Sequence, residues 1–356
     1  MATCSKPSNT DMAPSALNEN TERARDDNDL SCNTAKPVQQ RRKNVSFSSL
    51  PLQPEHPPFS AWGLWGKQDE LGTLNLITPK AVAAASAEVV LGLTIPLNLS
   101  LTALARPMNP ARKPCCHHIN VKGHANDDRV DFDTQGSSHW DGLRHYPYQS
   151  TLQYYNGVQQ DQISTNSPTL GIQNVARKGI ATRGVLLDWA RYAEDEGIDY
   201  SPFERHSIPL WQLKEVAARQ HVEFRGGDVL IIRTGWIKKY RALTLAEQLA
   251  LPDRPVRASC GVEASEEVMQ WHWENAFSAV VSDTVAYEVW PSPRPCGVSL
   301  HEVFLSGWGM MIGENWDLEQ LSQECRKYNR YSFFLTSMPV HIPGGVASPP
   351  GAMAIL

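Results

Sequence analysis

The sequence predicts an α+β protein with one folded domain. Two observations lead to this prediction. Short apolar runs rich in β-forming residues alternate irregularly with helical stretches, and no internal repeat divides the chain. With 356 residues the chain can bury a full core.

The N-terminal part differs in composition from the rest. Residues 1–48 are rich in Ser, Asn, Asp, Arg and Lys and nearly free of large apolar side chains. Such a segment cannot bury enough surface to offset its chain entropy. We therefore expect a disordered leader over residues 1–48 and a single domain over residues 49–356.

The elements of that domain follow from local patterns. Thr78 and Pro79 predict the start of a helix, and Ser265 predicts the start of another, with acidic residues in its first turn. Pro and Gly after residue 338 should interrupt regular structure until the apolar tail. The predicted strands are 184–189, 228–236 and 277–285, and the predicted helices are 79–90, 211–221, 265–275, 300–311 and 316–328.

Composition excludes several classes of protein. Charged residues make up 20% of the chain and the net charge is −5, which gives no reason to expect nucleic acid or an anionic membrane as partner. No apolar run approaches the roughly 20 residues that span a bilayer, and no secretory signal begins the chain. Seven irregularly spaced cysteines indicate reduced thiols and a cytoplasmic location. No nucleotide-binding glycine motif is present.

One cysteine–histidine cluster resembles a metal motif. It consists of four consecutive residues, Cys115, Cys116, His117 and His118. Adjacent residues rarely converge on one tetrahedral ion, and no partner pair follows at zinc-site spacing. We therefore do not expect a site there.

The segment 135–145 is the most informative for chemistry. In an extended chain Gln135, His139 and Asp141 point to the same face, so His139 and Asp141 could share a divalent ion. His145 would lie close enough to carry a proton, since imidazole titrates near neutral pH. The same alternation also fits a half-exposed strand whose histidines only make structural hydrogen bonds.

A second cluster lies far along the chain. His301, Glu302 and Glu314 occur among mostly apolar residues, where an ionised carboxylate is costly unless it is paired or binds a metal. Glu314 follows an apolar run and is the better ligand candidate, whereas Glu302 fits a solvated helix face. A capped or hydrogen-bonded residue is the alternative at each position.

These segments resemble the cyclase family of metal-dependent hydrolases, which includes bacterial kynurenine formamidase and isatin hydrolase. The family pattern HxGTHxDxPxH is similar to residues 135–145, and its later His and Glu align with His301 and Glu314. Further similar segments follow in the family's order, and residues 62–79 and 154–157 resemble a longer, fungal-type branch. The likeness covers roughly residues 60–356. These further segments are 183–189, 227–236, 282–284 and 343–356.

The resemblance implies a mixed β-sheet that forms a small barrel-like core flanked by helices, in a homodimer or higher oligomer. It implies a metal-activated water that hydrolyses an amide, formamide, lactam or lactone of a small molecule, as an arylformamidase of tryptophan catabolism does. His145 would be the catalytic proton carrier. Apart from the resemblance, the tryptophans would suit an aromatic substrate, with Trp140 as the candidate contact, although buried tryptophans more often belong to the core. These tryptophans are Trp140, Trp236, Trp290, Trp308 and Trp316. The implied ligands of a manganese, zinc or magnesium ion are His139, Asp141, His301 and Glu314.

The sequence departs from the family at its first motif position, where Gln135 replaces a metal-binding histidine. A Gln carbonyl binds zinc less well than imidazole does, so Gln135 would be a weak ligand. Two alternatives to hydrolysis therefore stay open. One is a ring-forming cyclase or dehydratase of secondary metabolism, and the other is a catalytically inactive binding protein of the same fold.

Overall fold

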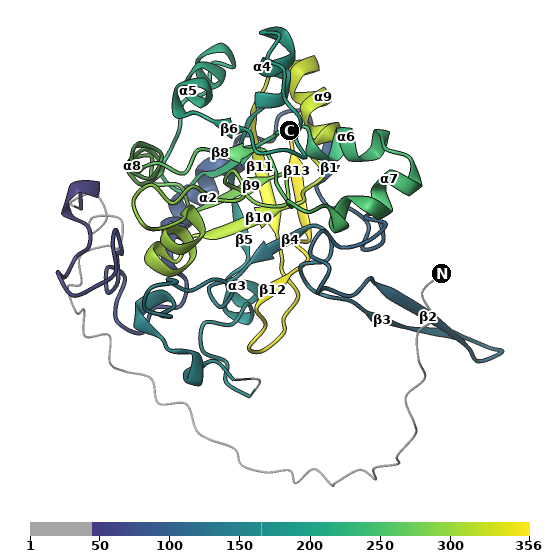
Figure 1. Ribbon diagram of the computed structural model, residues 1–356, viewed down its shortest axis with the longest axis horizontal. Coiled ribbons are helices and arrows are strands. Elements are labelled where there is room, and N and C mark those ends of the chain that lie inside the picture. The colour runs from purple at the N-terminus through teal and green to yellow at the C-terminus, as the bar shows by residue number, and fades with distance from the viewer. Residues whose placement is uncertain (1–44, 165) are drawn as a thin grey trace, which may run out of the picture. The chain divides into compact units, whose positions relative to one another are not determined.

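The protein is described by a computed structural model, which places residues 45–164 and 166–356. Its centre is a nine-stranded mixed sheet in the order β1-β13-β11-β5-β7-β9-β10-β4-β12. Strands β5, β7, β9 and β10 run parallel to one another, and the remaining pairs are antiparallel. The sheet curls into a half-barrel flanked by helices (Figure 1), which confirms the predicted fold class.

The elements have the following bounds. The strands are β1 (Thr94–Pro96), β2 (Cys116–Val121), β3 (Asn126–Asp131), β4 (His139–Asp141), β5 (Ile180–Leu187), β6 (Ser207–Ile208), β7 (Val229–Ile232), β8 (Gly261–Val262), β9 (Ala279–Ser282), β10 (Met311–Glu314), β11 (Ser332–Ser337), β12 (Ala347–Ser348) and β13 (Ala352–Ile355). The α-helices are α2 (Pro79–Ser86), α3 (Gln173–Lys178), α4 (Trp189–Asp195), α5 (Leu210–Arg219), α6 (Trp236–Ala242), α7 (Leu245–Ala250), α8 (Glu266–Glu274) and α9 (Glu319–Tyr328). Short 3-10 helices are η1 (Phe47–Ser49), η2 (Gly72–Leu76), η3 (Tyr155–Gly157), η4 (Gln160–Gln162) and η5 (Leu251–Asp253), and η6 (Glu302–Trp308) is a π-helix.

The central strands are apolar on both faces because both faces are covered. Leu230 and Ile232 of β7 belong to the core beneath α5, α8 and η6, whereas Val229 and Ile231 belong to the core beneath α2 and α9. A parallel strand buried on both sides reads as a continuous apolar run, and β7 does so in the sequence. The short runs therefore predicted these strands correctly.

Most of the predicted elements are confirmed, with shifted ends. The Thr78 side chain accepts a hydrogen bond from the backbone N–H of Ala81 at 3.2 Å, and Ser265 caps α8 in the same way. The helix predicted over 79–90 ends earlier, at Ser86. The helix predicted over 300–311 is the π-helix η6, which stops at Trp308 and leads into β10.

The end of η6 is fixed by a close approach of two glycines. Gly309 has a φ of 65°, and a Cβ atom there would lie 2.7 Å from the Cα atom of Gly72. The N–H of Thr73 donates to the carbonyl of Gly309 at 3.3 Å. No larger residue fits this contact, which sets where the chain leaves η6 and enters β10.

The predicted leader is only partly described. Residues 1–44 lie outside the described residues. Residues 45–48 belong to the folded body, because Phe47 is buried and stacks on Phe59 with ring centroids 5.3 Å apart. The last residues of the predicted leader thus pack on the body, where Trp273 Nε1 also donates to the carbonyl of Val45 at 3.0 Å, and the division into leader and domain stays a prediction.

Strands β2 and β3 form a separate two-stranded hairpin. Figure 1 shows it projecting away from the central sheet. Its side chains are exposed along almost the whole length of both strands, and Ile119 and Val121 are among them. Within residues 45–164 and 166–356, no helix combines the length and apolarity of a membrane span.

Candidate metal centre

The site is built on the antiparallel pair β4 and β10. Their register places His139 opposite Glu314 and Trp140 opposite Gly313. Side chains alternate between the two faces of a strand, so His139, Asp141 and Glu314 share one face and Trp140 takes the other. Two segments 170 residues apart in the sequence thus supply one cluster.

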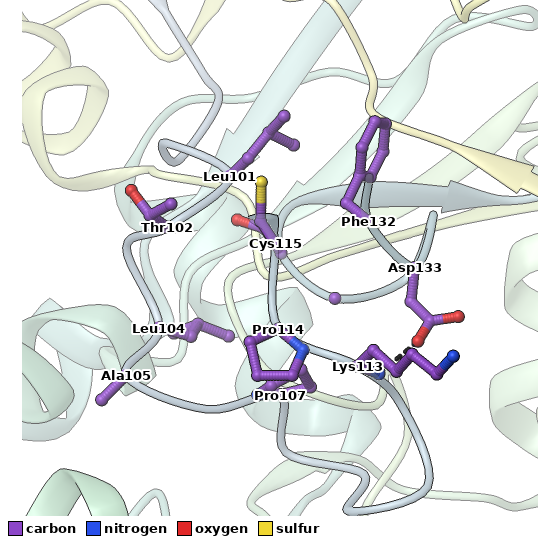
Figure 2. A pocket seen from close by; sticks show the side chains of 12 residues that line it. Leu101, Thr102, Leu104, Ala105, Pro107, Lys113, Pro114, Cys115, Phe132 and Asp133 are labelled. Carbon is purple, nitrogen blue, oxygen red and sulfur yellow. Dashed lines mark hydrogen bonds between the residues drawn. The ribbon is translucent and has the colours of Figure 1, made fainter. Parts of the chain in front are cut away.

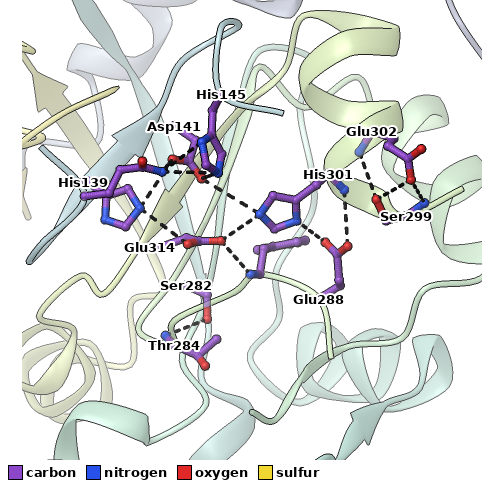
Figure 3. A network of polar contacts seen from close by, with 12 residues as sticks. His139, Asp141, His145, Ser282, Thr284, Glu288, Ser299, His301, Glu302 and Glu314 are labelled. Carbon is purple, nitrogen blue, oxygen red and sulfur yellow. Dashed lines mark hydrogen bonds and ion pairs between the residues drawn. The ribbon is translucent and has the colours of Figure 1, made fainter. Parts of the chain in front are cut away.

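The three shared side chains converge on a single point (Figure 3). Nε2 of His139 lies 3.5 Å from Oδ1 of Asp141 and 3.5 Å from Oε2 of Glu314. One ligand atom from each residue lies within 4.8 Å of the others, and all three residues are buried. Among the described residues this is the only group of three or more His, Cys, Asp or Glu side chains with that geometry.

The donor set fits a divalent ion. Nδ1 of His139 is 2.8 Å from the carbonyl of Ser137, which can only accept, so Nδ1 carries the proton and Nε2 keeps its lone pair. Nε2 of His139 and Oδ2 of Asp141 are buried atoms without a hydrogen-bond partner. Leaving such atoms unpaired is costly, and a cation between them would satisfy both.

His301 lies beside this cluster and is held by a residue that the sequence analysis missed. Its Nε2 is 3.1 Å from Oε1 of Glu314 and 4.0 Å from Oδ2 of Asp141. Its Nδ1 is 2.6 Å from Oε2 of buried Glu288. A buried carboxylate within the apolar run around Tyr287 is itself a signal of pairing, and it could have identified Glu288.

The electrostatics of the metal-free cluster favour protons. Burial lowers the pKa of His139, but the charges of Asp141 and Glu314 outweigh it, and the pKa is raised. Burial likewise opposes the charge of His301, and Glu288 and Glu314 raise its pKa well above the usual value. Burial raises the pKa of Glu314, but the two histidines together lower it below its ordinary range. A proton and a metal ion would therefore compete for the same atoms.

Gln135 points into the cluster, as the alternation predicts. The atom that it presents is the amide nitrogen, which lies 2.5 Å from Oδ1 of Asp141 and 3.1 Å from Nδ1 of His145. An amide N–H donates and cannot ligate a metal. In this arrangement Gln135 orients Asp141 and His145, and its role as a weak ligand stays a prediction.

His145 lies at the edge of the cluster, next to solvent. Its Nε2 is 3.8 Å from Oδ2 of Asp141, and 22% of its side chain is exposed. Burial lowers the pKa of His145, with further lowering by His301 and Arg112 and an opposing effect of Asp141. A neutral imidazole near pH 7 is the form that accepts a proton.

Two expectations for neighbouring residues are wrong. Trp140 does not face the site, because it lies between His139 and Asp141 on the strand; it is fully buried on the opposite face and donates to Ser337 Oγ at 2.9 Å. Glu302 is not solvated. It is fully buried and accepts hydrogen bonds from the backbone and side chain of Ser299, both at 2.8 Å.

A cavity of about 320 Å³ opens onto the cluster. Aromatic rings stand beside His301, with the centroid of Tyr146 at 5.6 Å and that of Trp290 at 6.4 Å. Three arginines also line it, and nothing in their loop sequences singles them out. The lining residues are Leu104, Met108, Asn109, Arg112, Gln135, His145, Tyr146, Trp236, Leu251, Arg254, Arg257, Ala258, Val285, Ala286, Trp290, His301, Glu314 and Asn315.

A second, smaller hollow of about 140 Å³ lies at the base of the hairpin. Figure 2 shows Cys115 and Asp133 on its wall. Cys115 is the first residue of the cluster 115–118, and His117 of that cluster pairs instead with exposed Asp128 at 2.8 Å. Residues 115–118 are not among the described groups whose possible ligand atoms lie together, and the absence of a metal site there stays a prediction.

Comparisons with known proteins identify a family model and solved structures that are similar to this chain. The "Putative cyclase" family model matches residues 51–289, more than half of the chain. No curated protein matches significantly. The crystal structure of a novel cyclase is 29% identical with a TM-score of 0.73, covering 83% of this chain and 99% of that one.

Two more distant structures share the fold. Isatin hydrolase A from Ralstonia solanacearum is 17% identical with a TM-score of 0.53, over 78% of this chain and 98% of that one. Isatin hydrolase A from Labrenzia aggregata, bound to benzyl benzoate, is 12% identical with a TM-score of 0.52, over 74% and 93% of the two chains.

Proposed function

The chain belongs to the cyclase family, and on that premise we propose that it is a metal-dependent hydrolase of a small, aromatic molecule. The bond cleaved would be the C–N or C–O bond of an amide, formamide, lactam or lactone. An arylformamidase-like activity is the specific form of this proposal.

One observation carries the proposal. Nε2 of His139 and Oδ2 of Asp141 are buried without partners and face Glu314 at the wall of a cavity. A scaffold protein has no physical need to keep such groups unpaired in its interior, because each costs about 1–3 kcal/mol. A catalytic centre needs them to hold an ion.

The proposed metal ligands come from the buried cluster and from His301. His139, Asp141 and Glu314 would hold a divalent ion, with His301 as a fourth ligand or as the hydrogen-bond partner that fixes Glu314. Two imidazoles and two carboxylates suit zinc or manganese, and magnesium is also possible in an oxygen-rich set. When bound, such an ion lowers the pKa of water and polarises a carbonyl group.

His145 is the proposed proton carrier. It is neutral near pH 7 because its pKa is lowered, and it faces the cavity rather than the core. It can accept a proton from the attacking water and return it to the leaving nitrogen or oxygen. Gln135 holds the ring through its amide nitrogen, 3.1 Å from Nδ1.

Of the tryptophans that the sequence offered for an aromatic substrate, Trp236 and Trp290 line the cavity, whereas Trp140 does not. Tyr146, Trp236 and Trp290 line it together with aliphatic side chains. A ring-bearing substrate of modest size would fit a cavity of about 320 Å³. The isatin hydrolases that share the fold support a ring amide as one substrate to test.

The test begins with metal content. Protein purified without chelator should carry close to one zinc or manganese ion per chain, and chelation should abolish hydrolysis of aryl formamides, isatin, lactones or simple amides. Readdition of metal should restore it. Absence of stoichiometric metal, together with no activation on adding it, would contradict the assignment.

The mass of the product distinguishes a hydrolase from the two alternatives that the sequence left open. Gln135 in place of the family histidine favours either a ring-closing enzyme or an inactive binding protein. Hydrolysis adds the mass of one water to the substrate, dehydrative ring closure removes it, and a binding protein leaves it unchanged. Assembly into a homo-oligomer and a cytoplasmic location stay predictions, which light scattering and cell fractionation can check.

A further inference from the structure

Three arginines line the same cavity as the candidate metal ligands. Arg112 lies on the loop before β2, and Arg254 and Arg257 follow η5. They come from two segments separated by more than a hundred residues, so the fold brings their charges together. Among the described residues, Glu314 is the only carboxylate on the cavity wall, and it already interacts with the two histidines of the cluster.

None of the three pairs with a carboxylate of the described residues. Arg112 donates from Nη1 to the backbone carbonyl of Gln135 at 2.8 Å. Arg254 donates to the backbone carbonyls of Leu251 and Ala258, both at 3.3 Å. These contacts leave most of the five N–H donors of each guanidinium unused.

Arg257 has no hydrogen bond or ion pair within the described part of the chain. Neighbouring arginines outside the cavity behave differently. Arg106 pairs with Asp253 at 2.5 Å, and Arg294 pairs with Glu302 at 2.8 Å. Arg106 and Arg294 thus each have a carboxylate partner and do not line the cavity, whereas the three arginines that line it have none among the described residues.

Three like charges around one cavity repel one another and attract an anion. Guanidinium groups match the planar geometry of a carboxylate and bind it through paired N–H donors. We infer that the substrate carries a carboxylate, which Arg112, Arg254 and Arg257 hold while its ring packs against Tyr146 and Trp290. This inference rests on the proposed function and specifies that the substrate of the proposed hydrolase is negatively charged.

The arginines would then set orientation as well as affinity. One end of the substrate is fixed by its charge, and the scissile carbonyl is directed toward the side of the cavity where His145, His301 and Glu314 lie. Such anchoring of a group remote from the reacting bond is one way to position a substrate for reaction. A neutral analogue of the same shape would lack the anchor.

The experiment uses matched probes that differ only in charge. The 2-, 3- and 4-formamidobenzoates are each paired with the corresponding formamidobenzamide, and kcat/KM is measured on the metal-loaded full-length protein. At least one acid should exceed its amide by about tenfold or more. Arg112→Gln, Arg254→Gln and Arg257→Gln should each reduce that preference, the triple variant should abolish it, and added salt should weaken it.

Arg326→Gln is the matched control, because Arg326 is exposed on α9, has no ion pair among the described residues and does not line the cavity. It should keep the wild-type preference. If the triple variant fails to fold, Arg257→Gln decides, since its side chain makes no contact that folding needs.

Calorimetric binding of the same probes separates this inference from the proposed function. Tighter binding of an acid that depends on the arginines, without turnover of any probe, would support the inference and contradict hydrolysis. Turnover of acid and amide at equal kcat/KM would support hydrolysis and overturn the inference. Equal or undetectable binding of both, or a preference that survives in Arg257→Gln and the triple variant, would also overturn it.

Discussion

Two regions of this protein concentrate metal-binding residue types, and among the described residues only one of them brings its possible ligand atoms together. The hairpin segment 115–118 holds two cysteines and two histidines in a row. The centre on β4 and β10 draws single residues from segments 170 positions apart. A run of ligand-type residues in the sequence is therefore a poorer indicator of a metal site than the pairing of distant strands.

Burial explains the difference. On the hairpin, 47% of the His117 side chain is exposed, so water and Asp128 satisfy it without an ion. On β4, His139 and Asp141 are fully buried, and each leaves an atom without a partner. A buried lone pair without a partner costs free energy, and a bound cation would remove that cost. An exposed lone pair is solvated by water and has no such cost.

The largest expected effect comes from removing a buried ligand. Asp141→Ala should lose stoichiometric metal and nearly all activity, because one of the anionic groups of the cluster is gone. The double variant His117→Ala/His118→Ala on the hairpin is the control and should keep both. Elemental analysis of the purified proteins checks this, and metal loss in the hairpin variant would reverse the comparison.

A smaller loss is expected when the cluster is intact and only proton transfer is removed. His145→Ala should keep its metal but lower kcat by on the order of 10²–10⁴-fold. Its lowered pKa also predicts that wild-type kcat/KM falls on the acidic side of neutrality as the base protonates. Loss of metal from this variant would instead place His145 among the ligands.

Glu288 acts on the centre through His301 and should matter less. Glu288→Gln weakens the hydrogen bond that orients the imidazole, so metal affinity should fall about 10–100-fold. Competition titrations with a chromophoric chelator measure this directly. Gln270→Glu on the solvated face of α8 is a charge-changing control, and an equal effect there would mean that the response is not specific to His301.

Proton competition should make the centre depend on pH. The raised pKa values of His139 and His301 stabilise the metal-free fold below the unfolded value of 6.5, and that contribution is lost as pH rises through the raised values. Metal affinity should rise over the same window, above about pH 6.5. Melting temperatures with and without zinc between about pH 6 and 9 should therefore diverge, and parallel curves would contradict this.

The smallest expected change concerns Gln135. Gln135→His replaces a neutral amide by imidazole and should tighten zinc binding, with a gain that fades below about pH 6 as the new ring protonates. Gln135→Ala should weaken binding only modestly. Equal affinities of wild type and Gln135→His at pH values above and below this point would show that residue 135 does not reach the ion.

The sequence predicted the fold better than the surroundings of the site. Apolar runs and helix caps predicted β7, β9, α5 and α8. These elements could be predicted because their burial follows the pattern of apolar and polar residues within a short stretch of sequence. The alternation that aligned His139 with Asp141 also implied that Trp140 faces away. That conclusion was within reach of the sequence alone.

Other features depend on tertiary contacts and have no local signature. The π-helix η6 is buried on all sides, so no amphipathic period revealed its geometry. Arg112, Arg254 and Arg257 stand on loops whose positions only the fold decides. Glu288 was the exception, since a carboxylate in an apolar run already requires a partner.

The register of β4 against β10 limits how this protein can diverge. Glu314 faces His139 because the residues of the two strands match one to one. Deleting one residue within Met311–Glu314 would turn the carboxylate toward Trp140 and leave the cluster without it. Substitutions around the cavity can change what the protein acts on, whereas a change of length in these two strands removes the centre in a single step.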